Sequence, residues 1–284
     1  MTYRECYEKG CHILNEAGIE ESTLDARLLL EAVCGTDRND LLVHGEQPVE
    51  PETEEKYFGW IGKRAGRIPL QQLTGEQDFM GLTFTVNENV LIPRQDTEIL
   101  VEEVLKELHD RMRILDMCTG SGCILLSLLH YSNDCEGLGV DLSAEALEVA
   151  GRNVLKVLTP EKAEHAHFLQ SDLFEKVEGK FEIIVSNPPY IASAEIEKLM
   201  PEVRDHEPRM ALDGTEDGLH FYRRIIKEAG KHLVNSGMLF FEIGYDQGQA
   251  VSELMRTGGY REVQVVQDYA GLDRVVLGTY CERN

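Results

Sequence analysis

Residues 185–190 read Val185-Ser186-Asn187-Pro188-Pro189-Tyr190, and they follow directly on the apolar run 181–185. A short apolar run bounded by turn residues predicts a buried strand. Two consecutive prolines cannot donate to a β-ladder, so the strand must end before them. Asn187 precedes a proline and is therefore held extended. The stretch predicts a rigid corner at the carboxyl end of a strand, where open α/β sheets bind ligands.

The chemistry of this corner suits methylation of a planar NH2 group. Such a nitrogen is a poor nucleophile because its lone pair is delocalised, and acceptors for its two N–H groups favour the charge that builds during methylation. The Asn187 side-chain oxygen and the Pro188 carbonyl would be these acceptors, and Tyr190 would lie against the flat substrate group. A strand end capped by a Pro-Pro turn is the alternative, and the tetrapeptide alone does not separate the two.

A second strand end carries a glycine-rich turn. The strand 113–117 leads into Cys118-Thr119-Gly120-Ser121-Gly122, and the apolar helix 124–129 follows. Strand, glycine turn and helix form the first half of a Rossmann-like nucleotide site, in which the helix N-terminus offers N–H donors to a carboxylate. The turn matches neither G-x-G-x-x-G nor G-x-x-x-x-G-K, which disfavours dinucleotides and triphosphates.

Two acidic residues follow the next two strands. Asp141 ends the strand 137–140, about twenty residues past the glycines, where such folds place a carboxylate on ribose hydroxyls. The alternative is that Asp141 caps the helix 144–158. Asp172 follows the strand 166–170 and would receive an adenine amino group, with Leu173 covering the ring. The alternative there is an ordinary loop aspartate.

The remaining strands complete an α/β fold with a mostly parallel sheet. A buried strand is expected at 237–243, after a helix at 218–233. The final strands, 260–267 and 273–280, alternate in polarity and are joined by a turn through Gly271, which predicts an antiparallel edge.

The first third of the chain differs in character. Residues 1–77 predict an N-terminal helical-bundle domain, which we assign to substrate docking. Residues 78–94 alternate around a glycine and predict a β-hairpin linker. The second domain is expected at 95–284, where Asp96 or Thr97 would cap its first helix.

Composition narrows the class of protein. The 51 acidic and 28 basic residues give a charge of −23, which disfavours binding to a nucleic-acid backbone. No apolar run approaches the roughly 18 residues that span a membrane, so no membrane association is expected. Seven cysteines without a CxxC pair indicate a reduced, cytoplasmic chain. Neither these cysteines nor the nine histidines form a metal-ligand pattern, so we expect no metal.

Five motifs occur in the order seen in one family. The motifs are Pro69-Leu70-Gln71-Gln72-Leu73-Thr74-Gly75, Leu91-Ile92-Pro93-Arg94-Gln95-Asp96-Thr97-Glu98, Ile114-Leu115-Asp116-Met117-Cys118-Thr119-Gly120-Ser121-Gly122, Asn187-Pro188-Pro189-Tyr190-Ile191, and Glu207-Pro208 through Asp217-Gly218-Leu219. With these motifs the chain resembles, over nearly its whole length, the release factor glutamine methyltransferases (HemK/PrmC family), which are class I S-adenosylmethionine-dependent methyltransferases.

The resemblance implies N5-methylation of the glutamine in the Gly-Gly-Gln tripeptide of peptide chain release factors, with S-adenosylmethionine as cofactor. By position, residues 118–122 would line the methionine part of the cofactor, Asp141 would hold its ribose, and Leu173 would flank its adenine. Asn187 would touch both cofactor and substrate. The substrate glutamine would be gripped by Asn187, Pro188, Pro189 and Tyr190, among which Asn187, Pro188 and Tyr190 are the expected catalytic residues. Cys118 stands where the family usually has glycine.

Two other functions fit parts of the pattern. An N6-adenine methyltransferase would act on the same kind of NH2 group, but it needs a flipped base and a basic groove, which the acidic charge disfavours. A non-catalytic module that senses the cofactor would not need Asn187 or the two prolines. Release factors are therefore the expected partners, and nucleic acid is not.

Overall fold

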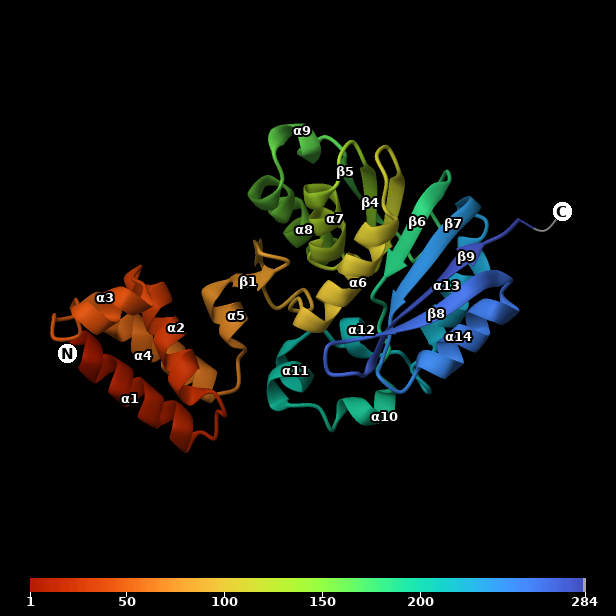
Figure 1. The fold of residues 1–284 in the computed structure, drawn as a ribbon. Coiled ribbons are helices and arrows are strands. Elements are labelled where there is room, and N and C mark those ends of the chain that lie inside the picture. The colour runs from red at the N-terminus through yellow and green to blue at the C-terminus, as the bar shows by residue number, and fades with distance from the viewer. Residues whose placement is uncertain (283–284) are drawn as a thin grey trace. The chain divides into compact units, whose positions relative to one another are not determined.

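The computed structural model describes residues 1–282, and their contacts divide the chain into two compact units. The first unit combines Met1–Gly75 with Met200–His206, and the second combines Glu76–Leu199 with residues 207–282. Each unit has its own hydrophobic core, and each is described here by itself (Figure 1). The domain boundaries expected at residues 77 and 94 stay a prediction.

The first unit is helical, as the sequence predicted. Its core is built from α1, α2 and α4, with Tyr57 and Leu29 completely buried. Gly10 lets α1 approach α4 closely, because a Cβ at Gly10 would lie 2.0 Å from the Tyr57 hydroxyl oxygen. The helices of this unit are α1 (Tyr3–Glu16), α2 (Ser22–Cys34), α3 (Arg38–Val43), α4 (Pro51–Ala65), α5 (Leu70–Thr74) and α11 (Pro201–His206).

A buried ion-pair network fastens α11 to the other helices of this unit. The Glu202 carboxylate accepts from Arg64 at 3.1 Å and from Arg67 at 3.2 Å. Arg64 also donates to Asp25 at 2.7 Å. A charge this deeply buried requires such partners, since removing one would leave another uncompensated. The network therefore explains why a segment so late in the chain belongs to the first unit.

The second unit is built on a seven-stranded sheet with the order β5-β4-β3-β6-β7-β9-β8. The strands from β3 to β7 are parallel to one another, whereas β9 is antiparallel to both β7 and β8. The predicted α/β class, with a mostly parallel sheet and an antiparallel edge, is confirmed. The strands are β3 (Arg113–Met117), β4 (Glu136–Asp141), β5 (Ala166–Gln170), β6 (Phe181–Ser186), β7 (Leu233–Glu242), β8 (Tyr260–Gln267) and β9 (Asp273–Tyr280).

Helices cover both faces of this sheet (Figure 1). One core cluster combines alternate strand residues such as Ile183 and Val185 with α6, α7 and α8, and a second combines Ile184 and its neighbours with α13 and α14. Burial on both faces explains why the central strand β6 has consecutive buried apolar residues from Ile183 to Val185. The helices of this unit are α6 (Gln95–Glu107), α7 (Cys123–Tyr131), α8 (Ala144–Val157), α9 (Pro160–Ala163), α10 (Ser193–Ile196), α12 (Arg209–Leu212), α13 (His220–Ala229) and α14 (Gly248–Thr257).

The second unit also contains the expected hairpin. Strands β1 (Glu76–Phe79) and β2 (Leu82–Thr85) pair antiparallel, and Phe79 and Phe84 are buried in the core against the sheet domain. The Asn153 side chain bonds to both the N–H and the carbonyl of Thr85, which fastens the hairpin to α8. Within residues 1–282, no helix is both long enough and apolar enough to span a bilayer.

Candidate active site

The site is organised around the point where the strand order of the sheet reverses. From β3 the chain builds outward through β4 and β5, and it then returns to place β6 on the other side of β3. Met117 and Ser186 are aligned in the parallel β3–β6 ladder, so Cys118 and Asn187 leave the sheet from adjacent strand ends. Such reversal points open a crevice in which α/β sheets bind their ligands.

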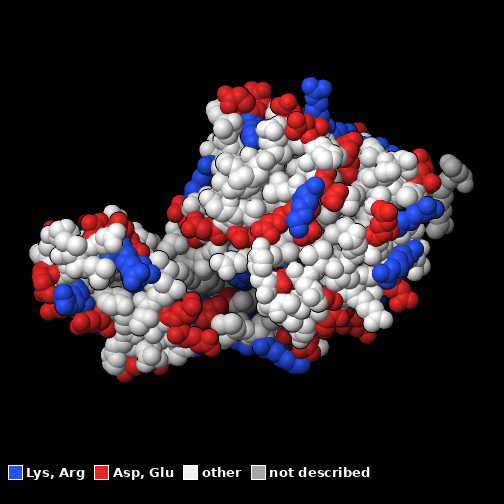
Figure 2. Space-filling view, in the orientation of Figure 1, with Lys and Arg blue, Asp and Glu red and all other residues white. Residues whose placement is uncertain are grey.

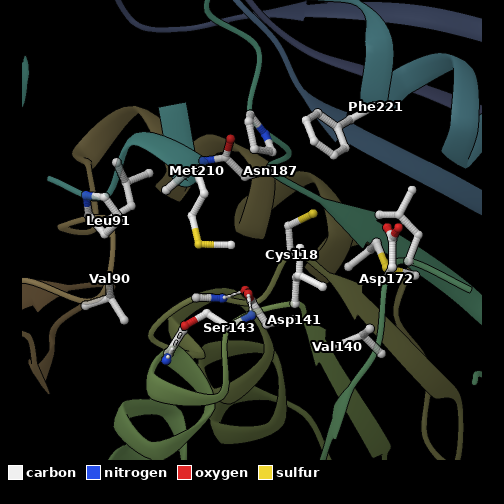
Figure 3. A pocket seen from close by; sticks show the side chains of 18 of the residues that line it. Val90, Leu91, Cys118, Val140, Asp141, Ser143, Asp172, Asn187, Met210 and Phe221 are labelled. Carbon is white, nitrogen blue, oxygen red and sulfur yellow. Dashed lines mark hydrogen bonds between the residues drawn. The ribbon is translucent and has the colours of Figure 1, made fainter. Parts of the chain in front are cut away.

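A cavity of about 370 Å³ opens at this edge, which lies in the size range of small-ligand sites. Figure 3 shows Asn187, Met210 and Phe221 on one side of it, opposite Asp141 and Ser143. The structure brings together seven of the predicted site residues along its wall: Cys118, Gly120, Asp141, Asp172, Leu173, Asn187 and Pro189. Five other predicted residues do not line this cavity: Thr119, Ser121, Gly122, Pro188 and Tyr190.

The turn after β3 has an unusual backbone. Cys118 has a φ of +63°, Gly120 of +55° and Gly122 of +78°, so all three lie in the left-handed region. That region costs an ordinary residue about 1–2 kcal/mol and glycine almost nothing, so Cys118 carries strain that a glycine at the same position would not. At Gly120 no atom lies within 4 Å of an added Cβ, so this part of the turn faces open space.

Asp141 is fastened to this turn. Its Oδ2 accepts from the Gly120 N–H at 2.9 Å, and its Oδ1 accepts from the Ser143 N–H at 2.9 Å. The cap of α8 is Ser143, whose hydroxyl accepts from Ala146, so Asp141 is not the helix N-cap. Burial raises the pKa of Asp141, although the two N–H donors act against it. The carboxylate is held in place at the cavity wall with lone pairs left for a ligand.

Asp116 lies beneath the same turn, and sequence reasoning missed it as part of the site. It is completely buried, and its Oδ2 accepts from the Thr119 hydroxyl at 2.6 Å and from the Leu125 N–H at 3.3 Å. Burial raises its pKa to about 7. Asp116 is the fourth residue of β3, and the sequence gave no sign of its role, because the burial of a carboxyl within a strand can be recognised only when its neighbours are known.

Asp172 and Leu173 close the opposite part of the wall. Leu173 is buried with a φ of +51°, a second non-glycine residue in the left-handed region at this cavity. Backbone strain of this kind gathers at functional sites. Asp172 pairs with Arg224 at 2.9 Å, and its role toward a ligand stays a prediction.

The Asn187 side chain is held from behind by α6. Its Nδ2 donates to the Thr97 hydroxyl oxygen at 3.4 Å, and Thr97 is 3% exposed. The expectation that Asp96 or Thr97 caps α6 is wrong, because this helix begins at Gln95 and Arg94 occupies the cap position. Thr97 lies inside the first turn and points into the protein, where it meets the corner.

The loop that precedes α13 supports the proline corner. Ile191 forms a bridge with Asp213, and Gln247 donates to the Tyr190 carbonyl at 3.0 Å. Gly218 has a φ of +71°, and a Cβ there would lie 2.3 Å from the same carbonyl oxygen. A Cβ on Gly214 would lie 2.8 Å from Tyr190 backbone atoms. Two glycines therefore let this loop pack directly on the corner.

The Tyr190 hydroxyl is already occupied. It donates to Glu242 at 3.4 Å, and Glu242 is the last residue of β7. Burial, with Glu242 close by, raises the pKa of Tyr190 well above its usual range. Tyr190 therefore stays protonated at neutral pH, and its hydroxyl is not a base.

Several wall residues were not predicted from the sequence. Met210 and Phe221 come from α12 and α13, and Val90 and Leu91 come from the segment after the hairpin (Figure 3). Their apolar side chains suit a flat ring. Leu91 and Met210 lie within the motifs quoted above, and Val90 and Phe221 lie close to them, so these motifs were the sequence signal for this part of the wall. Among the described residues 1–282, no three histidine, cysteine or acidic side chains gather in a way that could hold a metal ion.

The chain is similar in sequence and in fold to known methyltransferases. A family model described as the PrmC N-terminal domain matches residues 5–75, and one described as the methyltransferase small domain matches residues 94–203. A protein named release factor glutamine methyltransferase from Clostridium acetobutylicum is 41% identical over 281 residues, which cover 98% of each chain. One of the same name from Moorella thermoacetica is 43% identical over 281 residues, with the same coverage. A solved methyltransferase from Pyrococcus furiosus shares the fold, with a TM-score of 0.53 at 17% identity over 78% of this chain and 100% of that one.

Proposed function

We propose, on the premise that this chain belongs to the release factor glutamine methyltransferase family, that it methylates the side-chain amide nitrogen of a release factor glutamine. The glutamine is that of the Gly-Gly-Gln tripeptide, and the product is N5-methylglutamine. The observation that carries the proposal is that Asn187 and Asp141, the acceptor of a planar NH2 group and the carboxylate of a nucleoside site, line one cavity.

The cavity fits S-adenosylmethionine as the methyl donor. Asp141 has acceptor oxygens for a ribose diol, and Val90, Leu91, Met210 and Leu173 provide apolar surface for adenine. The open face at Gly120 leaves room for the amino-acid tail. When bound, this cofactor supplies an electrophilic methyl group on a sulfonium, whose sulfur leaves as a neutral thioether.

The residues of the chain position the substrate amide and stabilise its developing charge. The Asn187 oxygen and the Pro188 carbonyl accept from the two N–H groups of the glutamine amide, which favours the positive charge that builds on nitrogen. Methylation would leave a positive charge on the nitrogen, which would then release one proton to solvent. No strong base is required, because the alkylated nitrogen is acidic. Holding the reacting groups in this orientation supplies part of the roughly 7–11 kcal/mol by which proximity can lower an activation barrier.

The surface charge favours a protein substrate over a nucleic acid. Acidic side chains are spread over the face shown in Figure 2, and basic side chains lie singly or in small groups between them. A groove that tracks a phosphate backbone needs a continuous basic surface. We further place the reaction in the cytoplasm, where release factors act and where the seven free cysteines stay reduced.

The test incubates the full chain with methyl-labelled S-adenosylmethionine and a purified release factor, and it locates the label by peptide mass spectrometry. We expect one methyl group on the Gly-Gly-Gln glutamine and none when that glutamine is replaced by asparagine. Asn187→Ala should lower kcat by about 10²–10³. Asn133→Ala, an exposed amide outside the cavity, is the matched control.

Two results would refute the proposal. Label that appears on duplex DNA and not on the release factor would indicate an adenine methyltransferase instead. If Asn187→Ala turned over at close to the wild-type rate, Asn187 would not be an acceptor that the reaction needs.

A further inference from the structure

Two buried side chains lie behind the Asn187 corner, outside the cavity wall. Asn187 donates from Nδ2 to the Thr97 hydroxyl oxygen at 3.4 Å, and Tyr190 donates to Glu242 Oε1 at 3.4 Å. Thr97 is 3% exposed and Glu242 is 2% exposed. Neither residue can reach a ligand in the cavity, so any effect on the reaction must pass through the corner.

Glu242 has one oxygen left for Thr97. Its Oε1 accepts from the Tyr190 hydroxyl, whereas its buried Oε2 has no hydrogen-bond partner among residues 1–282. The nearby Thr97 hydroxyl lowers the pKa of this carboxyl and so favours its ionised form. The unpartnered oxygen is thus an acceptor to which the Thr97 hydroxyl can turn its proton.

A hydroxyl carries a single proton, and this decides which way the Asn187 amide points. If Thr97 gives its proton to Glu242, its oxygen can only accept, so Asn187 must turn its NH2 group toward Thr97. The Asn187 oxygen is then left for the cavity. Without this partner the amide can rotate by half a turn, which would set NH2 against the N–H groups of the substrate.

We propose that Glu242 and Thr97 are positioning residues, which hold the Asn187 side-chain amide with its oxygen directed to the substrate NH2 group. The inference rests on the proposed function for the identity of that substrate group. The contact between Asn187 and Thr97 is present without a ligand, so the orientation of the amide can be measured without turnover.

The protonation of Glu242 controls this chain. Burial raises the pKa of Glu242 to about 7, while the Thr97 hydroxyl and the Arg274 guanidinium lower it. A protonated Glu242 would donate to Thr97, and the Thr97 proton would then turn toward Asn187 and favour the rotated amide. Activity should therefore rise with pH through about 7. The other charged and titratable groups that face Glu242 are Asp96 on α6, Tyr190 after β6, Tyr222 on α13 and Cys123 on α7.

Arg274 does not neutralise Glu242 by itself, since it is already paired. It contacts Asp96 at 3.1 Å and Asp268 at 3.0 Å. Because these two acids already compensate the charge of Arg274, the ionised form of Glu242 is stabilised mainly by the hydroxyl groups beside it.

The kinetic test compares three variants of the full chain on the release factor. Thr97→Val keeps the shape and removes the hydroxyl, and we expect kcat to fall about 10-fold, the equivalent of one hydrogen bond, with KM unchanged. Thr97→Ser restores the hydroxyl and should recover most of kcat. Glu242→Gln should lose the rise in activity around pH 7.

The second readout is the NMR signal of the Asn187 side-chain NH2 group, assigned by its absence in Asn187→Ala. In the free wild type we expect it to shift with pH through about 7, and in Thr97→Val we expect this shift to vanish. Thr36→Val is the matched control, because the Thr36 hydroxyl oxygen is buried without a hydrogen-bond partner in the described chain. It should change neither kinetics nor spectrum.

Three results would overturn the inference. They are a Thr97→Val kcat within twofold of the wild type, a Thr97→Ser loss as large as that of Thr97→Val, or an unchanged pH profile in Glu242→Gln. If the wild type itself methylates no release factor, the proposed function fails, and the NMR comparison still decides whether the hydrogen-bond chain exists.

Discussion

The Ser186 hydroxyl donates to the Met117 carbonyl at 2.7 Å, and this bond joins the carboxyl ends of β6 and β3. Both residues are fully buried. The next residue on each strand, Asn187 and Cys118, lines the cavity. The two halves of the site are therefore fixed to each other by a bond between the residues that precede them.

Ser186→Ala should lower the free energy of unfolding by about 1–3 kcal/mol, because it leaves a buried carbonyl without that donor. Urea denaturation measures the change. Ser127→Ala is the matched control: Ser127 is completely buried in α7, and its hydroxyl has no hydrogen-bond partner among residues 1–282. Removal of that group should leave stability unchanged or raise it. Equal losses in both variants would contradict the role of the Ser186 bond.

Cys118 occupies a backbone conformation that suits glycine, with a φ of +63°. We expect Cys118→Gly to be the more stable variant and Cys118→Val the less stable, with a difference of about 2 kcal/mol, because a β-branched residue is the most strained in the left-handed region. Thermal unfolding measures the order.

Cys135 provides the control for this pair. It is 3% exposed and does not have a positive φ. There glycine should be the less stable substitution, since it empties core volume and adds chain entropy. The same order at both positions would show that burial, and not backbone strain, governs position 118.

Gly218→Ala should damage the corner through a direct clash. Its Cβ would lie 2.3 Å from the Tyr190 carbonyl oxygen, in addition to the strain of a φ of +71°. Gly271→Ala introduces the strain alone, because Gly271 has a φ of +79° and no atom within 4 Å of an added Cβ. We expect Gly218→Ala to lose at least about 2 kcal/mol more stability than Gly271→Ala and to lower kcat as well. Matching losses in denaturant would argue against contact between the loop and the corner.

Stability should fall as pH rises, because of Glu242. Burial raises its pKa from 4.5 to about 7, so the folded state holds this proton more tightly than the unfolded state. Its contribution is complete below the unfolded pKa and is lost as pH rises through about 7. We expect Glu242 to account for a loss on the order of 3 kcal/mol between about pH 5 and 8.

Urea denaturation across that range measures this slope, which Glu242→Gln should reduce. Asp116, whose pKa burial also raises to about 7, should supply part of the slope that remains, together with Asp141 and Glu207, whose pKa values burial also raises. Glu216→Gln, at an exposed position, is the control and should leave the slope as it is. A Glu242→Gln slope equal to that of the wild type would contradict the assignment.

Much of the fold could be predicted because local patterns were strong. The strands at 113–117, 166–170, 260–267 and 273–280 were placed at their observed bounds. The start of β7 was placed too late, at 237 instead of Leu233, and the preceding helix was extended too far. The reason is a bulge: Ser236 has a φ of +66°, and the β6–β7 register shifts there. A bulge interrupts the alternation by which a strand is recognised.

The candidate site was predicted in part. Asn187 and Asp141 follow strand ends, a position that sequence periodicity can indicate, and both line the cavity. Ser143 took the capping role that was considered for Asp141, because the chain makes a turn before α8 begins. Thr97 was expected at a helix cap and lies instead against Asn187, because α6 already begins at Gln95, two residues before Thr97. The catalytic and binding roles of these residues stay predictions.

By itself the sequence determined which segments are strands, where each strand ends and which polar groups stand at those ends, since these follow from local polarity, proline and glycine. Only the tertiary structure decided that Glu242, 52 residues from Tyr190, meets the back of the corner. It also decided that Met210 and Phe221 close the cavity. The physical reason is that the burial and the hydrogen-bond partners of a side chain depend on which elements pack together. The sequence alone therefore does not distinguish a buried carboxyl from an exposed one.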